Sequence, residues 1–197
     1  MIIFNRKVGD HRMLKVKTDI IPVPGQCFKV AGLWMTAAAW DDEGITFLCL
    51  DTPFIRNLKA EQLHFSGPIG SGFTDVVTSK SLVVAGGTGI AAVMSIVSTR
   101  KEEQETHLAF YSKQDGLLTT IVKNLGLGDT LKTLNSLTEW NTTSLGRPTG
   151  PLDPFLAAII DPVQYKIFVA GPKSLMEATQ KQCQELGVPD KNFHTNF

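Results

Sequence analysis

The chain has 197 residues, and its 19 basic and 19 acidic side chains give a formal net charge of zero. A neutral chain lacks the basic surface typical of proteins that bind nucleic acids or acidic membranes, and no apolar run reaches the roughly 20 residues that a membrane span needs. The cysteines Cys27, Cys49 and Cys183 are far apart, so we expect a cytoplasmic globular protein without a disulfide framework or a metal site.

Short apolar runs separated by turn residues fill the first part of the chain. The runs lie at residues 13–17, 27–30, 45–50 and 63–65, and turns are indicated at residues 24–25, 41–44 and 67–70. Several short strands at close spacing, punctuated by glycine and proline, are typical of a small barrel or sandwich. We therefore expect a small antiparallel barrel over residues 1–75.

After residue 75, apolar runs alternate with segments of helical periodicity. Strands are expected at residues 82–85, 107–111, 131–137, 165–170 and 193–197, and helices at residues 90–97, 117–125, 151–160 and 172–186. Residues 141–150, rich in threonine, serine and glycine, are expected to form a loop. Alternating strands and helices predict a parallel, doubly wound α/β domain over residues 76–197.

The strongest local motif is a glycine loop made of Gly86, Gly87, Thr88 and Gly89. It follows a buried strand and opens a helix, so bare backbone N–H groups can approach a pyrophosphate at a helix N-terminus. The loop matches neither the G-x-G-x-x-G fingerprint nor the P-loop pattern. A tight turn that binds nothing is the alternative interpretation.

A second glycine, Gly171, follows the strand at residues 165–170 and precedes Pro172 and a helix. The carboxyl ends of parallel strands meet at one edge of the sheet, so both loops are expected to face one ligand. Gly-Pro is also a common turn, and that alternative stays open.

Several motifs in the same order resemble those of the ferredoxin-NAD(P)H reductase superfamily, and the resemblance covers nearly the whole chain. The matching segments are Pro24-Gly25-Gln26, Gly67-Pro68-Ile69-Gly70-Ser71-Gly72-Phe73, Gly86-Gly87-Thr88-Gly89-Ile90-Ala91, Ala170-Gly171-Pro172 with Met176, and residues 194–197. The resemblance implies a six-stranded flavin-reductase-type barrel at residues 1–75 and an NAD(P)-binding domain at residues 76–197. The chain looks most similar to the electron-transfer subunits of dihydroorotate dehydrogenase and to the sulfhydrogenase gamma subunit, without their C-terminal cysteine cluster.

The flavin signature of this superfamily, Arg-x-Tyr-Ser/Thr, falls on Leu33-Trp34-Met35-Thr36. The resemblance implies that FAD binds against Trp34, Met35 and Thr36, with Thr36 as the catalytic residue that faces the flavin ring. Leu33 cannot pair with a flavin phosphate, and Arg56 is the candidate that supplies the missing charge.

Phe197 is the candidate C-terminal aromatic beside the flavin. The competing interpretations are a packed Trp34, a solvated Arg56 and a frayed Phe197.

The resemblance further implies that Gly171 and Pro172 border the nicotinamide. The choice between NAD and NADP depends on residues after the second strand of the parallel sheet. Ser112 and Lys113 could bind a 2′-phosphate, which favours NADPH, whereas Asp115 could repel it and favour NADH. A solvated loop is the third possibility.

The first functional hypothesis is an electron-transfer subunit of an oxidoreductase, which passes electrons between NAD(P)H, a flavin and a redox partner protein. The alternative is a non-catalytic binding or assembly module of a redox complex, in which the flavin site has degraded. A third, a soluble oxidoreductase that acts alone on a small acceptor, is less favoured. Hydrolytic chemistry is disfavoured because the sequence contains no nucleophile–histidine–acid order and no metal-spaced histidine pair.

Overall fold

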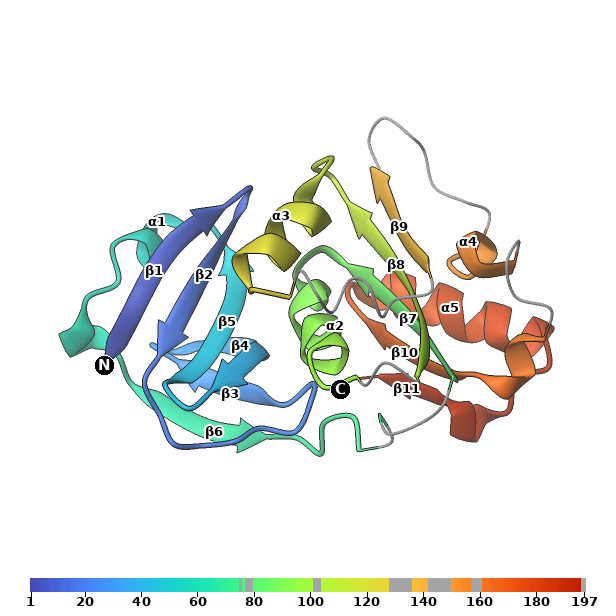
Figure 1. Ribbon diagram of the computed structural model, residues 1–197, viewed down its shortest axis with the longest axis horizontal. Helices are drawn as coiled ribbons and strands as arrows, with labels where there is room; N and C mark the ends of the chain where they lie inside the picture. Colours follow the sequence, from blue (N-terminus) through green and yellow to red (C-terminus); the bar gives the residue numbers. More distant parts are fainter. Residues whose placement is uncertain are drawn as a thin grey trace.

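The computed structural model describes residues 1–74, 76, 80–100, 104–127, 136–141, 150–156 and 161–195. Two sheets lie side by side, with the N-terminal antiparallel sheet curled at one end of the molecule and a parallel sheet at the other (Figure 1). Among the described residues, no helix combines the length and the apolar character needed to cross a membrane.

The N-terminal sheet has six antiparallel strands in the order β1-β2-β5-β4-β3-β6, which confirms the predicted fold of this half. Its core contains Phe28 and Phe47 in edge contact, and the ring of Phe65 stacks on Phe28 with centroids 5.1 Å apart. A short helix, α1, follows the sheet's β5. The strands and α1 are β1 Ile2–Val8, β2 His11–Val16, β3 Cys27–Val30, β4 Leu33–Asp41, β5 Gly44–Leu50, α1 Pro53–Arg56 and β6 Phe65–Ile69.

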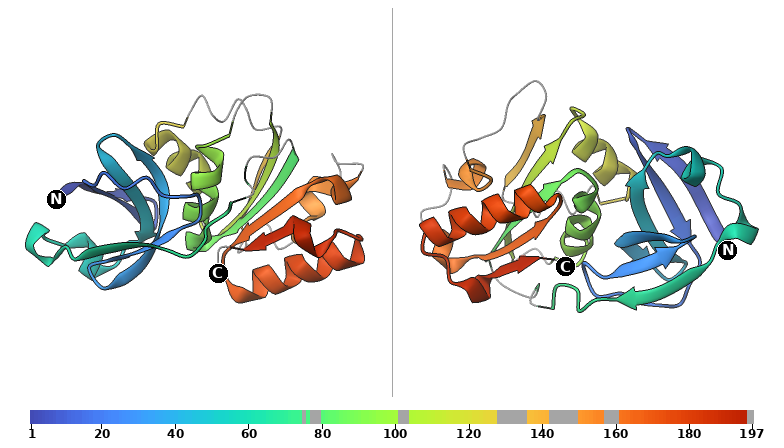
Figure 2. Two further views of the ribbon diagram at one scale, coloured as in Figure 1. Left: turned by 90° about the horizontal axis from the view of Figure 1, so that it is seen from below. Right: turned by 180° about the vertical axis from the view of Figure 1, so that it is seen from behind.

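The C-terminal sheet has five parallel strands in the order β11-β10-β7-β8-β9, and the predicted parallel α/β architecture is confirmed. Helices lie on both faces, with α5 on one face and α2 on the other (Figure 2). The elements are β7 Lys80–Gly86, α2 Ile90–Val97, β8 Glu105–Ser112, α3 Leu117–Asn124, β9 Ser136–Asn141, α4 Asp153–Leu156, β10 Lys166–Ala170, α5 Lys173–Glu185 and β11 Phe193–Thr195.

The continuous apolar run of β7 is explained by burial on both faces. Val83 and Ala85 pack in the cluster that contains α2 and α3, whereas Leu82 and Val84 pack in the cluster that contains Cys183 of α5. Successive strand residues point to opposite faces, so a strand covered on both sides needs an apolar residue at every position.

The two halves are joined by the segments that matched the superfamily around Gly25 and Phe73. The Gly25 N–H donates to the Ser95 hydroxyl of α2 over 2.9 Å, and the Phe73 N–H donates to the Pro24 carbonyl over 2.6 Å. The Phe73 ring meets Phe168 of β10 edge-on at 5.4 Å. A Cβ on Gly25 would lie 2.6 Å from the Phe73 ring, so glycine is required for this close approach.

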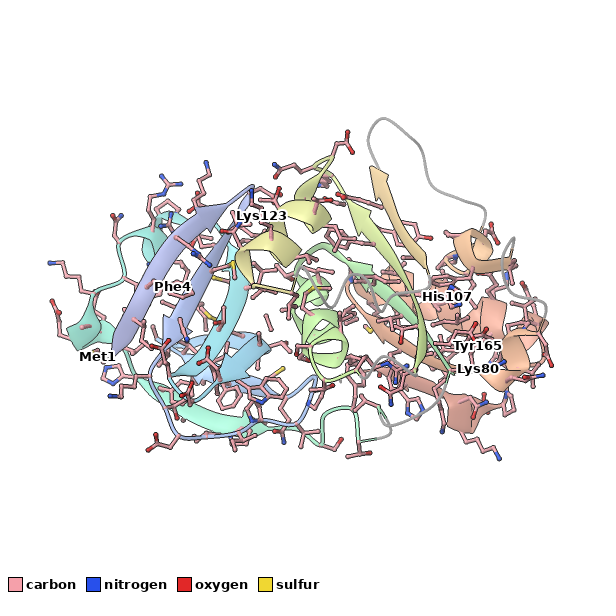
Figure 3. The ribbon with its side chains drawn as sticks, viewed as in Figure 1. Met1, Phe4, Lys80, His107, Lys123 and Tyr165 are labelled. Carbon is pink, nitrogen blue, oxygen red and sulfur yellow. The ribbon has the colours of Figure 1, made fainter. Side chains whose placement is uncertain are left out.

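A polar network fastens the amino-terminal edge of the parallel sheet, opposite the glycine loops. Glu105, at the start of β8, accepts hydrogen bonds from the Tyr165 hydroxyl and from His107 Nε2, the latter over 3.0 Å, and Lys80 lies 3.8 Å from its other oxygen. Figure 3 shows His107, Tyr165 and Lys80 together at the end of the sheet that lies away from the barrel. The hydrogen bonds from Tyr165 and His107 lower the pKa of Glu105.

Helix α3 begins without a capping side chain of its own. The carboxylate of Glu139, on β9, accepts from the backbone N–H groups of Leu117 and Leu118 over 3.1 and 3.2 Å. Its pKa is raised by burial, although these two hydrogen bonds act in the opposite direction. This cap comes from another strand, so no local sequence pattern indicates it.

The element bounds differ from the expected ones in several places. The strands β1 and β4 had not been predicted, and β9 covers Ser136–Asn141 instead of residues 131–137. Parts of three expected elements lie outside the described residues. These parts are residues 131–135 of the strand expected at 131–137, residues 157–160 of the helix expected at 151–160, and residues 196–197 of the last strand. Most of the predicted loop, residues 142–149, lies outside them too.

Candidate functional site

A cavity of about 980 Å³ lies where the barrel meets the carboxyl edge of the parallel sheet. One wall comes from β2, β3, β4, β5 and α1, and the other comes from the loops after β7, β8 and β10, from the first half of α5 and from Pro151. The barrel wall comprises Asp10, His11, Cys27, Leu33, Trp34, Met35, Thr36, Leu48, Cys49, Leu50, Thr52 and Ile55. The opposite wall comprises Gly86, Gly87, Thr88, Gly89, Tyr111, Ser112, Lys113, Pro151, Gly171, Pro172, Ser174, Leu175 and Ala178.

The glycines of the first loop serve two different purposes. A Cβ on Gly89 would lie 2.1 Å from the Ala170 carbonyl oxygen, and a Cβ on Gly86 would lie 2.7 Å from Leu175. These two glycines therefore allow the first loop to pack against the second. Gly87 differs, because it has φ +54° and a Cβ there would meet no described atom within 4 Å.

The two glycine loops touch each other at the cavity. Gly171 has φ +155°, and a Cβ there would lie 3.0 Å from the Gly86 nitrogen. The first loop follows β7, and the second loop, Gly171 and Pro172, lies between β10 and α5. Because β7 and β10 are neighbours in the parallel sheet, both loops lie at the carboxyl ends of adjacent strands. Ligands of parallel sheets gather at this edge, and both loops contribute backbone to the cavity wall.

The stretch that matched the flavin signature forms part of the barrel wall. Trp34 is 61% exposed and Leu33 is 42% exposed, whereas Met35 is only 4% exposed and packs mainly into the barrel core. The Thr36 hydroxyl lies 3.3 Å from the Cys27 thiol on the neighbouring strand. This wall therefore presents an indole, a hydroxyl and a thiol along one side of the cavity.

Arg56 does not line the cavity. Its guanidinium lies 3.0 Å from the Asp51 carboxylate, which also pairs with Arg12 over 3.2 Å. The hydrogen bond from Arg56 lowers the pKa of Asp51, helped by Arg12. The guanidinium that was predicted to replace the missing arginine at position 33 is therefore already paired. The other candidate of this part of the site, Phe197, lies outside the described residues.

The loop after β8 gives unequal support to the two predicted phosphate ligands. The Ser112 hydroxyl donates to the Gln114 carbonyl over 2.9 Å and accepts from the Gln114 N–H over 3.0 Å, so the turn itself uses this side chain. Lys113 is exposed and is the one lysine or arginine in the described cavity lining. Asp115 is absent from that lining.

Sequence reasoning missed several residues of the cavity, above all His11 and Cys27. His11 is 2% exposed, and its Nδ1 lies 2.5 Å from the carboxylate of Asp10. Cys27 and Cys49 are both partly buried and both line the cavity. Burial raises the pKa of the Cys49 thiol to about 11. These residues come from β2, β3 and β5, and only the pairing of the barrel strands brings them to one cavity.

No protein-family model matches the chain. Among curated proteins, the ferredoxin–NAD(P)⁺ reductase CarAd of Metapseudomonas resinovorans is 29% identical over 147 residues. That match covers 72% of this chain and 44% of CarAd, so the chain spans less than half of this relative.

Solved structures give a broader likeness. The ferredoxin reductase of carbazole 1,9a-dioxygenase matches with a TM-score of 0.77 and 21% identity, over 99% of this chain and 67% of that one. The Amycolatopsis cytochrome P450 reductase GcoB matches with a TM-score of 0.77 and 15% identity, over 99% and 67% of the two chains. The flavohemoglobin of Malassezia yamatoensis, solved with bound FAD and heme, gives a TM-score of 0.71 at 14% identity, over 98% and 58%. The chain therefore has the ferredoxin reductase-like fold, an antiparallel barrel joined to a parallel sheet with a cavity between them.

Proposed function

We propose that the protein is an NAD(P)H-dependent flavin oxidoreductase that passes electrons between a reduced nicotinamide, FAD and a redox partner protein. The observation that carries this proposal is the shared cavity, in which Trp34 and Thr36 of the barrel face the same space as Gly87 and Gly171 of the parallel sheet. Hydride transfer needs the two rings in contact, and a cavity between the two halves of the fold provides one space for both.

The residues of the cavity fit these two groups. The exposed indole of Trp34 offers a stacking surface for a planar ring, and the hydroxyl of Thr36 offers a hydrogen bond at its edge. The open backbone at Gly87 leaves room for a diphosphate next to bare N–H groups, and Lys113 supplies a cation on the same wall. Position 33 fits less well, because leucine cannot pair with a flavin phosphate.

The chemistry would be that of the cofactor, since a flavin accepts a hydride and releases electrons singly. The contribution of the chain is to bind and to orient. Gly86, Gly89 and Gly171 hold the two loops in contact, so the backbone of the nicotinamide side is preorganised. Thr36 would fix the flavin edge, and Leu48 and Leu50 give the cavity an apolar surface that limits water.

Several finer assignments belong to this proposal. Residues 1–75 form the flavin-binding unit and residues 76–197 the nicotinamide-binding unit. The protein acts in the cytoplasm as one subunit of a complex, similar to the electron-transfer subunits of dihydroorotate dehydrogenase. Lys113 in the cavity wall, with Asp115 outside it, favours NADPH over NADH.

The test is the visible spectrum of the purified protein before and after reconstitution with FAD. Bands near ~375 and ~450 nm that stay with the protein through gel filtration are the expected result for a bound flavin. The variant Trp34→Ala is expected to bind FAD more weakly, and Trp40→Ala serves as a matched control because Trp40 does not line the cavity. A protein that stays colourless after reconstitution contradicts the proposal and supports a non-catalytic binding module.

A further inference from the structure

One residue of the barrel wall, His11, carries a buried nitrogen without a hydrogen-bond partner in the described part of the chain, and the proposed function has not used this residue. His11 belongs to the cavity lining, and its side chain is 2% exposed. Among the described residues, its Nε2 is buried and has no hydrogen-bond partner. Buried polar atoms in folded proteins are nearly always paired, so an orphaned one indicates a missing partner.

The position of His11 is fixed by strand pairing with β5 and by the turn that precedes it. It pairs with Leu50 across β2 and β5, and Leu50 also lines the cavity. The preceding turn between β1 and β2 packs beside α3 (Figure 1), where the Asp10 N–H donates to Gln114 Oε1 over 2.9 Å. A Cβ on Gly9 would lie 2.5 Å from that same oxygen. His11 therefore sits at the junction between the barrel and the nucleotide side of the cavity.

Asp10 determines which nitrogen of His11 is available. An ionised carboxylate can only accept hydrogen bonds, so the 2.5 Å contact with Asp10 places the proton of a neutral imidazole on Nδ1. The lone pair is then on Nε2. A group that fills this position must supply an N–H or O–H donor.

We propose that Nε2 of His11 accepts a hydrogen bond from an N–H or O–H group of the ligand bound in the cavity, so that His11 is a ligand-positioning residue. The inference rests on the proposed function. In the sheet order β2-β5-β4, His11 and Thr36 lie on strands separated by β5, with Leu48 and Leu50 of β5 between them in the cavity wall. Polar groups at two ends of an apolar surface suit a planar heterocycle with polar edges, and both an imide edge of a flavin and the hydroxyls or carboxamide of a nicotinamide nucleotide provide the donor.

The experiment measures ligand binding and the His11 ring in the same samples. Wild type, His11→Phe and His11→Gln are titrated separately with FAD, FMN and NADPH, and the Nε2 nitrogen signal of His11 is followed by NMR with ¹⁵N-labelled histidine. Phenylalanine keeps a ring of similar size without the acceptor, whereas glutamine keeps a polar group at a similar reach. His64→Phe and His64→Gln are matched controls, because His64 is exposed and lies outside the cavity lining.

The expected result is a shift of the His11 Nε2 signal when one ligand class is added, and the class that causes it identifies the donor. His11→Phe should weaken binding of that ligand about two- to tenfold, the range expected for one lost neutral hydrogen bond, and His11→Gln should restore part of it. If wild type binds a ligand while the Nε2 signal stays unchanged and His11→Phe binds equally well, the inference about His11 is wrong and the proposed function stands. If wild type binds none of the three ligands, the proposed function is overturned and this inference with it.

Discussion

Alanine substitutions at Gly87 and Gly89 separate the two reasons for glycine in the first loop. At Gly89 an added methyl group would lie 2.1 Å from the Ala170 carbonyl oxygen and 2.6 Å from the Gly171 nitrogen. Both atoms belong to the backbone, so the two loops must move apart. At Gly87 the same methyl group would meet no described atom within 4 Å, and the change is confined to the left-handed backbone at φ +54°.

The two variants should differ in stability and in binding. Overpacking against backbone costs about 1–3 kcal/mol or more, so Gly89→Ala should lower the unfolding temperature by roughly 5–10 °C for a chain of this size. An alanine in the left-handed region costs about 1 kcal/mol, which lowers it by only about 2–4 °C. Gly87 lines the cavity, and an added methyl group would occupy space that the proposed function assigns to the nucleotide. This variant should therefore lose NAD(P)H affinity about tenfold, which corresponds to about 1.4 kcal/mol.

The measurements are thermal unfolding by circular dichroism and NAD(P)H titration by fluorescence, on wild type and both variants. A matched control is Gly32→Ala, because Gly32 has φ +83°, no described atom within 4 Å of an added Cβ, and no place in the cavity lining. Gly32→Ala should match the stability loss of Gly87→Ala and keep full affinity. The reasoning is refuted if Gly89→Ala is as stable as wild type, or if Gly87→Ala and Gly32→Ala bind the nucleotide equally well.

Three further changes test other parts of the account. Phe73→Ala removes a fully buried ring between the barrel and β10 and should lower the free energy of unfolding by about 3–5 kcal/mol. Urea unfolding measures this loss, and a loss under about 1 kcal/mol contradicts the role of Phe73 in joining the two halves. Glu105→Gln should cost about 1 kcal/mol at neutral pH. The pKa of Glu105 is lowered from its ordinary 4.5, so the stabilisation by its carboxylate is present above pH 4.5 and is lost as the pH falls through the lowered pKa. A difference in the free energy of unfolding between wild type and Glu105→Gln that stays constant from pH 3 to 7 contradicts this prediction. Leu33→Arg adds a cation at a partly exposed cavity position. The variant should bind FAD about fivefold more tightly than wild type at low salt and lose this gain at high salt. If the variant binds FAD with equal affinity at both salt concentrations, the result speaks against a phosphate near position 33.

The parallel half of the fold could be predicted from the sequence because its signals are local. The apolar run that ends at Ala85 is buried on both faces of the sheet, and the glycines that follow it mark the turn into α2. The strand before Gly171 has the same character. In each case one continuous segment of sequence contains both the strand and its loop, so no distant contact is needed to recognise it.

The strands β1 and β4 could not be recognised in this way. β4 contains three consecutive alanines, Ala37, Ala38 and Ala39, and alanine is depleted in strands. β1 contains Asn5, Arg6 and Lys7 next to each other. Both strands are stabilised by their partners, since β1 pairs with β2 and β4 pairs with β3 and β5. Pairing with neighbouring strands therefore continues these two elements through segments of weak local propensity.

The site could be predicted in part, where a local motif contains the residues that line the cavity. Motif residues from the two glycine loops and from residues 33–36 all reach the cavity, because each lies at the end of a strand or on a barrel strand that faces it. Arg56 is the cation expected to replace the missing arginine at position 33, but Asp51, five residues away, pairs with it instead. His11 had no signal, since a lone histidine in an alternating strand gives no indication of the cavity that it faces.

The central claim is that one cavity brings a flavin and a reduced nicotinamide into contact. The most direct measurement is the absorbance near ~450 nm of the FAD-reconstituted protein during anaerobic titration with NADPH and NADH. The account predicts that this band is bleached by about one equivalent of one of the two nucleotides, and that Gly87→Ala slows the bleaching more than Gly32→Ala does. A protein that holds FAD and keeps its full absorbance with excess of both nucleotides would contradict the claim.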